Sequence, residues 1–173
     1  MLIIFEQKKF TLKEEYRKYL ELAVSRRKEN KRTIQKLKRL KSSQVNSMFH
    51  SLHHEAFEIF DCLECANCCS NVGPRIADTD INRISRSLKV KPSEFVNTYL
   101  TIDEDKDYIM KSMPCPFLLH DNYCSIYEIR PKACKGYPHT DHLKMSGILN
   151  LTLRNAESCP AVCWIFEKLS LNH

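Results

Sequence analysis

Nine cysteines are the feature that most limits what this chain of 173 residues can fold into. None precedes Cys62, and four stand together in the segment Cys62-Leu-Glu-Cys65-Ala-Asn-Cys68-Cys69. Two intervening residues allow a tight turn to direct two thiolates at one centre, and repeating that spacing supplies three ligands from one loop. One further sulfur completes four-coordination. The segment therefore predicts a metal-binding knuckle in preference to a set of disulfide bonds.

The remaining cysteines are too far apart to form a knuckle by themselves, but they are sufficient to complete one or two sites. They are Cys115, Cys124, Cys134, Cys159 and Cys163. Adjacent side chains usually diverge, so we expect Cys68 and Cys69 to serve different metal ions or different edges of one polynuclear centre. Eight thiolates make two four-sulfur sites and leave one cysteine over. We expect this to be Cys163, as a small buried hydrophobic residue in the last predicted helix.

The spacing does not choose the metal. A C-x2-C-x2-C run occurs in ferredoxin-type iron–sulfur sites, and paired C-x2-C units also hold structural zinc. The sequence shows no secretory signal, and its longest apolar run, Ala161–Phe166, is far shorter than the roughly 20 residues of a membrane span. We therefore expect a cytoplasmic protein whose thiols stay reduced, which favours metal ligation over disulfides.

Charge divides the chain at the same place as the cysteines. Residues 1–61 carry 14 Lys and Arg against 8 Asp and Glu, whereas residues 62–173 carry 13 of each. Residues 1–61 also contain no proline, and apolar positions recur at helical spacing over 12–24 and again over 34–59. These patterns predict a basic helical arm at 1–61, with two long helices, followed by a cysteine-cluster metal-binding domain at 62–173.

The second part is expected to contain shorter elements, because all seven prolines lie in it. The predicted elements are helices over 80–88, 92–100 and 160–169, with short strands over 108–113 and 123–126 around a turn at 120–122. The expected fold is small and mainly helical with a short β-hairpin, of the α+β class. Such a segment forms little hydrophobic core, whereas one structural zinc contributes about 10–16 kcal/mol. We therefore expect metal to stabilise it.

The cysteine pattern as a whole resembles a known family. The knuckle is followed by Cys115-Pro-Phe-Leu, by Cys124-Ser-Ile-Tyr-Glu-Ile-Arg-Pro-Lys-Ala-Cys134-Lys-Gly-Tyr-Pro, and by Cys159-Pro. This arrangement closely resembles the YkgJ-like CxxCxxCC family, whose members are described as zinc- or iron-chelating cysteine-cluster proteins and sometimes as iron–sulfur proteins. The resemblance implies eight metal-binding residues: Cys62, Cys65, Cys68, Cys69, Cys115, Cys124, Cys134 and Cys159. This sequence departs from the family pattern at Ala66, where many relatives have glycine, and in the basic arm, which lies outside the shared region.

Other polar residues offer weaker candidates. Arg130 is expected either to offset the negative charge of a thiolate site or to pair with Glu128 or Asp121. His50 and His54 share a helix face at a spacing that can bind a metal, but no H-E-x-x-H motif is present. His139 and His142 could replace a sulfur in one site. For these histidines the alternative is an ordinary solvated or interface role.

A basic stretch lies between Arg26 and Lys41, with nine Lys and Arg against one acidic residue, Glu29. Such a stripe can contact phosphates of RNA, DNA or lipid, but it contains no aromatic residue to stack on bases. A solvated or protein-facing helix is the favoured interpretation, with nucleic acid as the alternative. The three glycines, Gly73, Gly136 and Gly147, exclude a glycine-rich phosphate loop.

Three functions follow as hypotheses. The first is a metal-binding protein that holds an iron–sulfur cluster or zinc and serves in electron transfer or metal handling. The second is a maturation factor or enzyme whose cluster takes part in modifying a protein or RNA. The third is a structural zinc scaffold for protein contacts. The sequence itself leaves open whether the protein is an enzyme.

Overall fold

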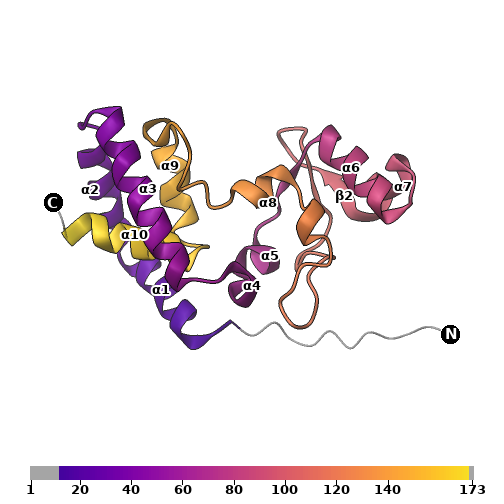
Figure 1. Cartoon of the computed structure of the whole chain (residues 1–173), viewed down its shortest axis with the longest axis horizontal. Helices are drawn as coiled ribbons and strands as arrows, with labels where there is room; N and C mark the ends of the chain where they lie inside the picture. The colour runs from indigo at the N-terminus through magenta and orange to yellow at the C-terminus, as the bar shows by residue number, and fades with distance from the viewer. Residues whose placement is uncertain (1–11, 172–173) are drawn as a thin grey trace. The chain divides into compact units, whose positions relative to one another are not determined.

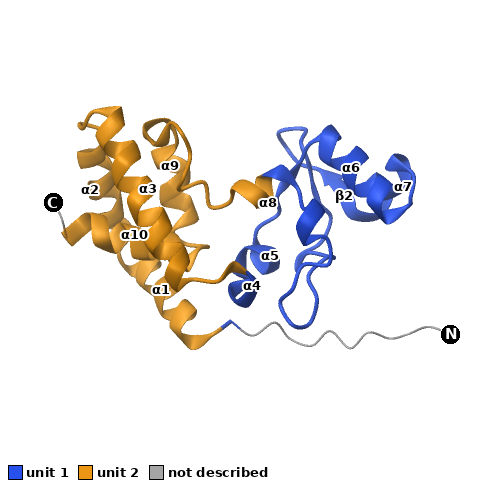
Figure 2. Cartoon of the chain, in the orientation of Figure 1, with its two compact units in different colours: residues 1–12, 63–132 blue, residues 13–62, 133–173 orange. Residues whose placement is uncertain are grey.

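A computed structural model describes residues 12–171 of the chain, which form two compact units. Among these residues, unit 1 comprises 63–132, and unit 2 comprises 13–62 together with 133–171 (Figure 2). Helices dominate and one small antiparallel sheet is present (Figure 1). The expected small, mainly helical fold with a short β element is therefore confirmed. No helix within 12–171 is long and apolar enough to cross a bilayer.

Unit 2 is a helical bundle. Its main helices are α1 (Glu14–Ser25), α2 (Arg27–Leu37), α3 (Ser42–Ile59), α9 (Met145–Asn155) and α10 (Pro160–Leu171). Helix α10 packs on α1, α2 and α3, and α9 packs on α2 and α3. Most of the apolar positions predicted from the sequence face inward: Ile34 of α2, Val45 of α3 and Phe166 of α10 are each no more than 1% exposed. Val24 and Ile59 are exceptions and are exposed. Burial of the inward-facing side chains is what holds the bundle together.

The N-terminal region contains three helices in place of the two expected. The continuous helix predicted over 34–59 is interrupted between Leu37 and Ser42. Lys41 has an extended backbone (φ −64°, ψ 141°), and its amide donates to the Gln44 side chain at 3.1 Å. That bond is a helix-start signal of the capping type, with the glutamine three residues into the new helix. The apolar stripe continued through it, which is why periodicity alone missed the break.

Unit 1 combines a small sheet with short helices. The sheet has the order β1-β3-β2, and both pairings are antiparallel, from β1 (Arg75–Ile76), β2 (Leu100–Ile102) and β3 (Tyr108–Met110). Around it lie α6 (Asp78–Leu88), α7 (Pro92–Tyr99) and the 3-10 turn η1 (Tyr127–Ile129). Helices were predicted over 80–88, 92–100 and 160–169, and α6, α7 and α10 confirm all three.

The predicted hairpin between 108–113 and 123–126 is wrong in its partner. Strand β3 pairs instead with β2 through Leu100 and Met110, and with β1 through Ile76 and Tyr108. The segment around Cys124 makes only an isolated bridge to Leu118. Residues 103–107 form the turn of the real hairpin, with the Asp103 carboxylate accepting from the amides of residues 105 and 107. This Asx-type turn is the signal that was overlooked.

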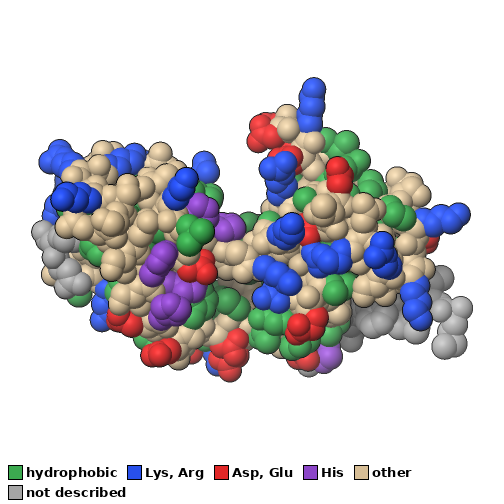
Figure 3. Space-filling model, turned by 45° about the horizontal axis from the view of Figure 1, so that its top comes forward, with side chains coloured by type: hydrophobic (Ala, Val, Ile, Leu, Met, Phe, Trp, Pro, Cys, Tyr) green, Lys and Arg blue, Asp and Glu red, His purple; other side chains and the backbone are tan. Residues whose placement is uncertain are grey.

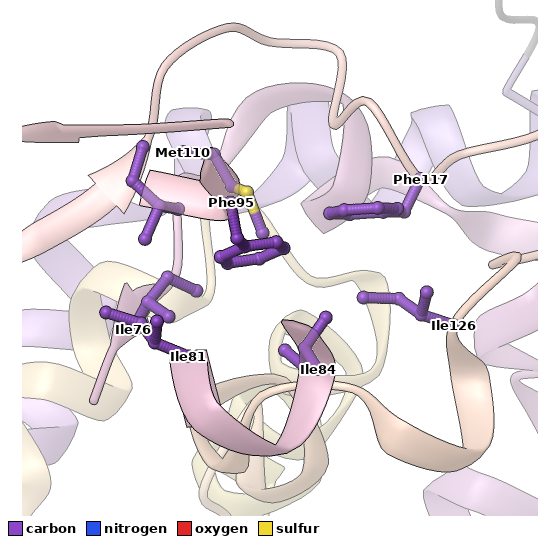
Figure 4. Close-up of a cluster of buried hydrophobic side chains, with 8 residues drawn as sticks. Ile76, Ile81, Ile84, Phe95, Met110, Phe117 and Ile126 are labelled. Carbon is purple, nitrogen blue, oxygen red and sulfur yellow. The ribbon is translucent and has the colours of Figure 1, made fainter. Parts of the chain in front are cut away.

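Unit 1 also has a hydrophobic core, contrary to the expectation that this part of the chain would bury little. Phe95 is fully buried and stacks on Phe117, with ring centroids 6.3 Å apart (Figure 4). The cluster joins α6, α7, the sheet and the loop after Phe117, and its members are Ile76, Ile81, Ile84, Phe95, Leu100, Met110, Phe117 and Ile126. Many short elements converge on one point, so short length did not prevent core formation. Cys115 and Cys124 pack against its edge.

The boundary at residue 62 proposed from charge and cysteine content lies within one residue of a boundary between the compact units, and a second boundary lies between residues 132 and 133. The described part of the basic arm forms one unit with residues 133–171. Helix α8 (Lys132–Gly136) begins where the chain returns to unit 2, and α4 (Cys62–Cys65) contains the first crossing.

Candidate metal centre

The cysteine knuckle is built from two very short helices. Helix α4 begins at Cys62 and ends at Cys65, and α5 (Asn67–Asn71) carries Cys68 and Cys69. Between them Ala66 has a left-handed backbone, φ 44° and ψ 13°, and is 2% exposed. Left-handed geometry costs an alanine energy that a glycine does not pay. The position at which many members of the resembled family have glycine is therefore the one that reverses the chain between the two C-x2-C steps.

Two later cysteines lie against the knuckle. The amide of Cys115 donates to the carbonyl of Cys69 at 2.8 Å, which joins the knuckle to the loop that follows β3. A small turn brings Cys124 to the knuckle. Cys124 forms an isolated β-bridge with Leu118, and the Leu119 amide donates to the Tyr123 carbonyl at 2.8 Å. The side-chain amide of Asn122 also donates to the Glu64 carbonyl at 2.9 Å. Backbone hydrogen bonds thus position both loops at the knuckle.

Electrostatic coupling shows which thiols are neighbours. Cys69 acts on Cys65, Cys115 and Cys124, raising the pKa of each in addition to the larger effect of burial. Burial raises the pKa of Cys115 furthest, to about 11. A half-buried group of thiols that disfavour one another's negative charge is suited to a cation, whose binding releases the protons.

Cys68 and Cys69 are in contact, so the expected divergence of their side chains is wrong. A side-chain hydrogen bond from Cys68 lowers the pKa of Cys69 to about 7, against the opposing effect of burial. In a helix as short as α5 the two side chains can turn toward each other, because no further turns of helix constrain them. Five of the predicted ligands therefore lie in one region of unit 1 and affect one another's pKa, namely Cys65, Cys68, Cys69, Cys115 and Cys124.

Arg130 lies near this group and does not pair with Glu128 or Asp121 as one alternative proposed. Its guanidinium lies 3.8 Å from the centroid of the Tyr127 ring and donates to the Tyr127 carbonyl at 2.7 Å. Its positive charge also acts on Cys124, lowering the pKa of that thiol against the effect of burial. A cation stacked on an aromatic ring beside thiols offsets negative charge that collects there.

The other cysteines belong to unit 2. Cys62, Cys134 and Cys159 lie there, Cys62 exposed and Cys159 buried. Cys163 is 2% exposed within α10, and burial raises its pKa to about 12. The expectation of Cys163 as a buried hydrophobic residue is therefore confirmed. All nine residues, which fall within the described range, are thiols without disulfide bonds.

Several histidines belong to unit 2, and Figure 3 shows side chains of this type together on one face. Nδ1 of His53 lies 2.8 Å from the Thr140 hydroxyl, and Nε2 of His50 lies 3.1 Å from the His142 carbonyl. Burial lowers the pKa of His53 and of His139. The histidines thus join α3 to residues 139–142, which is the structural role weighed against ligation.

Within residues 12–171, no group of three or more His, Cys, Asp or Glu side chains already has an arrangement able to hold a metal ion.

Part of the basic stretch is used inside unit 2. Arg27 donates to both carboxylate oxygens of Glu157 at 2.7 Å, Arg26 pairs with Glu167 at 3.2 Å, and Lys38 donates to Asn150 at 3.1 Å. These contacts tie α1 and α2 to α9 and α10. The stripe is therefore not wholly available for a partner.

One pair of polar residues was missed by sequence reasoning. Asp80 and Arg83 of α6 form an ion pair, and Asp80 is 1% exposed. An acidic residue in the first turn with a basic residue three positions later is common on exposed helices, so the pattern gave no sign of burial.

No curated protein and no solved structure matches this chain. A family model, CxxCxxCC, matches residues 61–163, and its description reads "Putative zinc- or iron-chelating domain". The match covers the knuckle and every later cysteine. The chain therefore belongs to the CxxCxxCC family of zinc- or iron-chelating domains.

Proposed function

We propose that this protein binds a metal through its cysteine cluster, as an iron–sulfur or zinc protein, and serves in electron transfer or metal handling. The observation that carries the proposal is the grouping of thiols around Cys69 within the region that defines the family. Sulfur is the ligand that both zinc and iron–sulfur clusters prefer. We propose that these thiols move closer together when the ion binds.

The proposed ligands are the eight cysteines of the family pattern. Five of them, Cys65, Cys68, Cys69, Cys115 and Cys124, form the proposed centre of unit 1. Cys62, Cys134 and Cys159 are proposed as further ligands, and Cys163 is not. The thiols must be deprotonated and reduced to bind metal, so we propose a reducing compartment such as the cytoplasm.

Burial and charge support this role for the unit 1 centre. Partial burial makes the neutral thiols stable without metal and makes isolated thiolates costly, so a cation is needed to compensate the charge. Arg130 supplies a part of that compensation beside Cys124. When bound, zinc would supply a fixed structural link, whereas an iron–sulfur cluster would supply a one-electron carrier.

Anaerobic purification with metal analysis and an absorption spectrum tests the proposal. Brown protein that absorbs near roughly 400 nm, from thiolate-to-iron charge transfer, would support an iron–sulfur protein. Colourless protein with stoichiometric zinc would reject electron transfer and favour the structural zinc scaffold. Reduced, freshly prepared protein that folds and yet takes up neither iron nor zinc would reject metal binding altogether.

A further inference from the structure

An ion pair between a buried carboxylate, Asp80, and a partly exposed arginine, Arg83, holds the segment that follows Cys124. Arg83 pairs with Asp80, and its guanidinium also donates to the backbone carbonyls of Ile129 at 2.5 Å and Arg130 at 3.2 Å. The second carboxylate oxygen of Asp80 accepts from the amide of Lys132 at 3.2 Å. Two side chains of α6 thus hold three backbone groups on a segment about 50 residues away in the chain.

The segment needs such support because its own backbone cannot provide it. Pro131 has no amide hydrogen, and Arg130 is extended, with φ −57° and ψ 153°, immediately after η1. The carbonyls of Ile129 and Arg130 would otherwise be left without a helical partner. The planar fork of arginine spreads its donors over three nitrogens and so suits two carbonyls and a carboxylate, whereas lysine donates from a single nitrogen.

The support reaches the cysteine cluster through Arg130. The backbone of Arg130 is held by Arg83, and its side chain stacks on Tyr127, whose amide donates to the Cys124 carbonyl at 3.0 Å. Loss of the Asp80–Arg83 pair would therefore release the backbone from which the guanidinium beside Cys124 projects. Burying a carboxylate is costly unless it is paired, and Arg83 together with the Lys132 amide supplies that pairing for Asp80.

We propose that Asp80 and Arg83 are positioning residues for the metal centre of unit 1, which hold the Ile129–Lys132 segment and thereby fix Arg130 beside Cys124. This inference rests on the proposed function of the cysteines. The ion pair is not a ligand of the metal. It acts on the metal centre through the backbone and charge of a neighbouring loop. Mutation of such supporting residues in metal proteins typically lowers metal affinity about 10- to 100-fold.

The test compares Arg83→Gln, Arg83→Lys and Asp80→Asn with Arg86→Gln, which alters an exposed arginine on the same helix. Three measurements are made on the full chain. Hydrogen exchange of the 124–132 segment is followed in metal-free protein, transfer of Zn²⁺ to a competing chelator is titrated, and the thiolate-to-metal absorption of the Co²⁺-loaded protein is recorded. Far-UV circular dichroism establishes that each variant is folded.

We expect Arg83→Gln to exchange faster over 129–132, to lose Zn²⁺ at least tenfold more readily and to shift the Co²⁺ absorption, whereas Arg86→Gln matches the wild type. Arg83→Lys keeps the positive charge, and Asp80→Asn keeps the side-chain size and one acceptor oxygen. If Arg83→Gln does not fold, these two variants replace it in the test, and we expect smaller changes in the same direction from them. Folded variants with wild-type exchange, affinity and absorption would overturn the inference and leave the proposed function standing. A wild-type protein that binds neither Zn²⁺ nor Co²⁺ would instead overturn the proposed function, and the inference with it.

Discussion

The amide of Cys115 donates a 2.8 Å hydrogen bond to the carbonyl of Cys69, which joins two proposed ligands that lie far apart in the sequence. The bond is made by backbone atoms and therefore does not depend on either side chain. Replacing a thiol at these positions leaves the contact between the loops in place. This makes the two cysteines suitable sites for separating metal ligation from folding.

We expect Cys69→Ala and Cys115→Ala to lose bound metal while keeping the fold of unit 1, because each removes a sulfur ligand but no backbone bond. Cys163→Ala is the matched control: it makes the same substitution at a buried thiol of α10, where it should retain metal and lower the free energy of unfolding by about 1 kcal/mol. Metal content per chain and urea unfolding measure the two effects. Equal metal loss in all three variants would contradict the assignment.

The sequence identified the chemistry of the site better than its three-dimensional arrangement. Spacing and family pattern named the eight cysteines, and helix-start residues located α6, α7 and α10. Periodicity could not locate the break before Ser42, because the apolar stripe passes through it and only the Lys41–Gln44 bond marks the new start. Short helices such as α5 follow no repeat at all, which is why the contact between Cys68 and Cys69 was not foreseen.

Tertiary pairing accounts for the other errors. The 108–113 strand was predicted to pair with 123–126, whereas the turn formed by Asp103 brings it to β2. The core around Phe95 draws single residues from many short elements, and no window of sequence contains enough of them to predict it. Asp80 and Arg83 resembled an ordinary exposed pair, because their true partners lie on a distant segment.

We expect Ala66→Gly to be neutral or to stabilise the protein by up to about 1 kcal/mol. Glycine removes the strain of a left-handed alanine, while greater freedom of the unfolded chain offsets part of the gain. Ala156→Gly is the matched control, because Ala156 is equally buried but has φ −59°. It should destabilise by about 0.5–1 kcal/mol. Thermal unfolding measures both, and a larger loss at Ala66 than at Ala156 would argue against strain in the knuckle.

We expect unit 2 to lose stability as the pH falls below about 6.5. Burial lowers the pKa of His53 from its ordinary 6.5, with His54 and His50 adding to the shift and Asp141 opposing it. The unfolded chain therefore binds more protons than the folded one between the lowered pKa and 6.5. The stability contributed by neutral His53 is present above 6.5 and is lost as the pH falls through the folded-state pKa.

Urea unfolding at pH 7 and pH 5.5, followed by the fluorescence of Trp164 in α10, measures this dependence. His53→Gln can keep a hydrogen bond to Thr140 but cannot titrate, so it should reduce the pH dependence. His120→Gln alters an exposed histidine of unit 1 and should leave it unchanged. If the free energy of unfolding of His53→Gln changes with pH as much as that of the wild type, other groups cause the pH dependence. His139 is the first of these to examine, because burial also lowers its pKa.

Metal removal should affect the two units unequally. The core around Phe95 gives unit 1 some stability of its own, and bound metal would add a contribution of up to about 10–16 kcal/mol. A chelator should therefore lower the unfolding midpoint of unit 1, measured by hydrogen exchange in α6 and α7. Trp164, the single tryptophan, is 8% exposed in unit 2 and reports on that unit alone. Because Cys62, Cys134 and Cys159 of unit 2 are proposed as further ligands, the Trp164 transition should also move, but less than that of unit 1, since the helical bundle has a larger core of its own. A Trp164 transition that stays in place with the chelator would remove Cys62, Cys134 and Cys159 from the ligand set. Unchanged exchange in α6 and α7 would mean that packing, and not metal, holds unit 1 together.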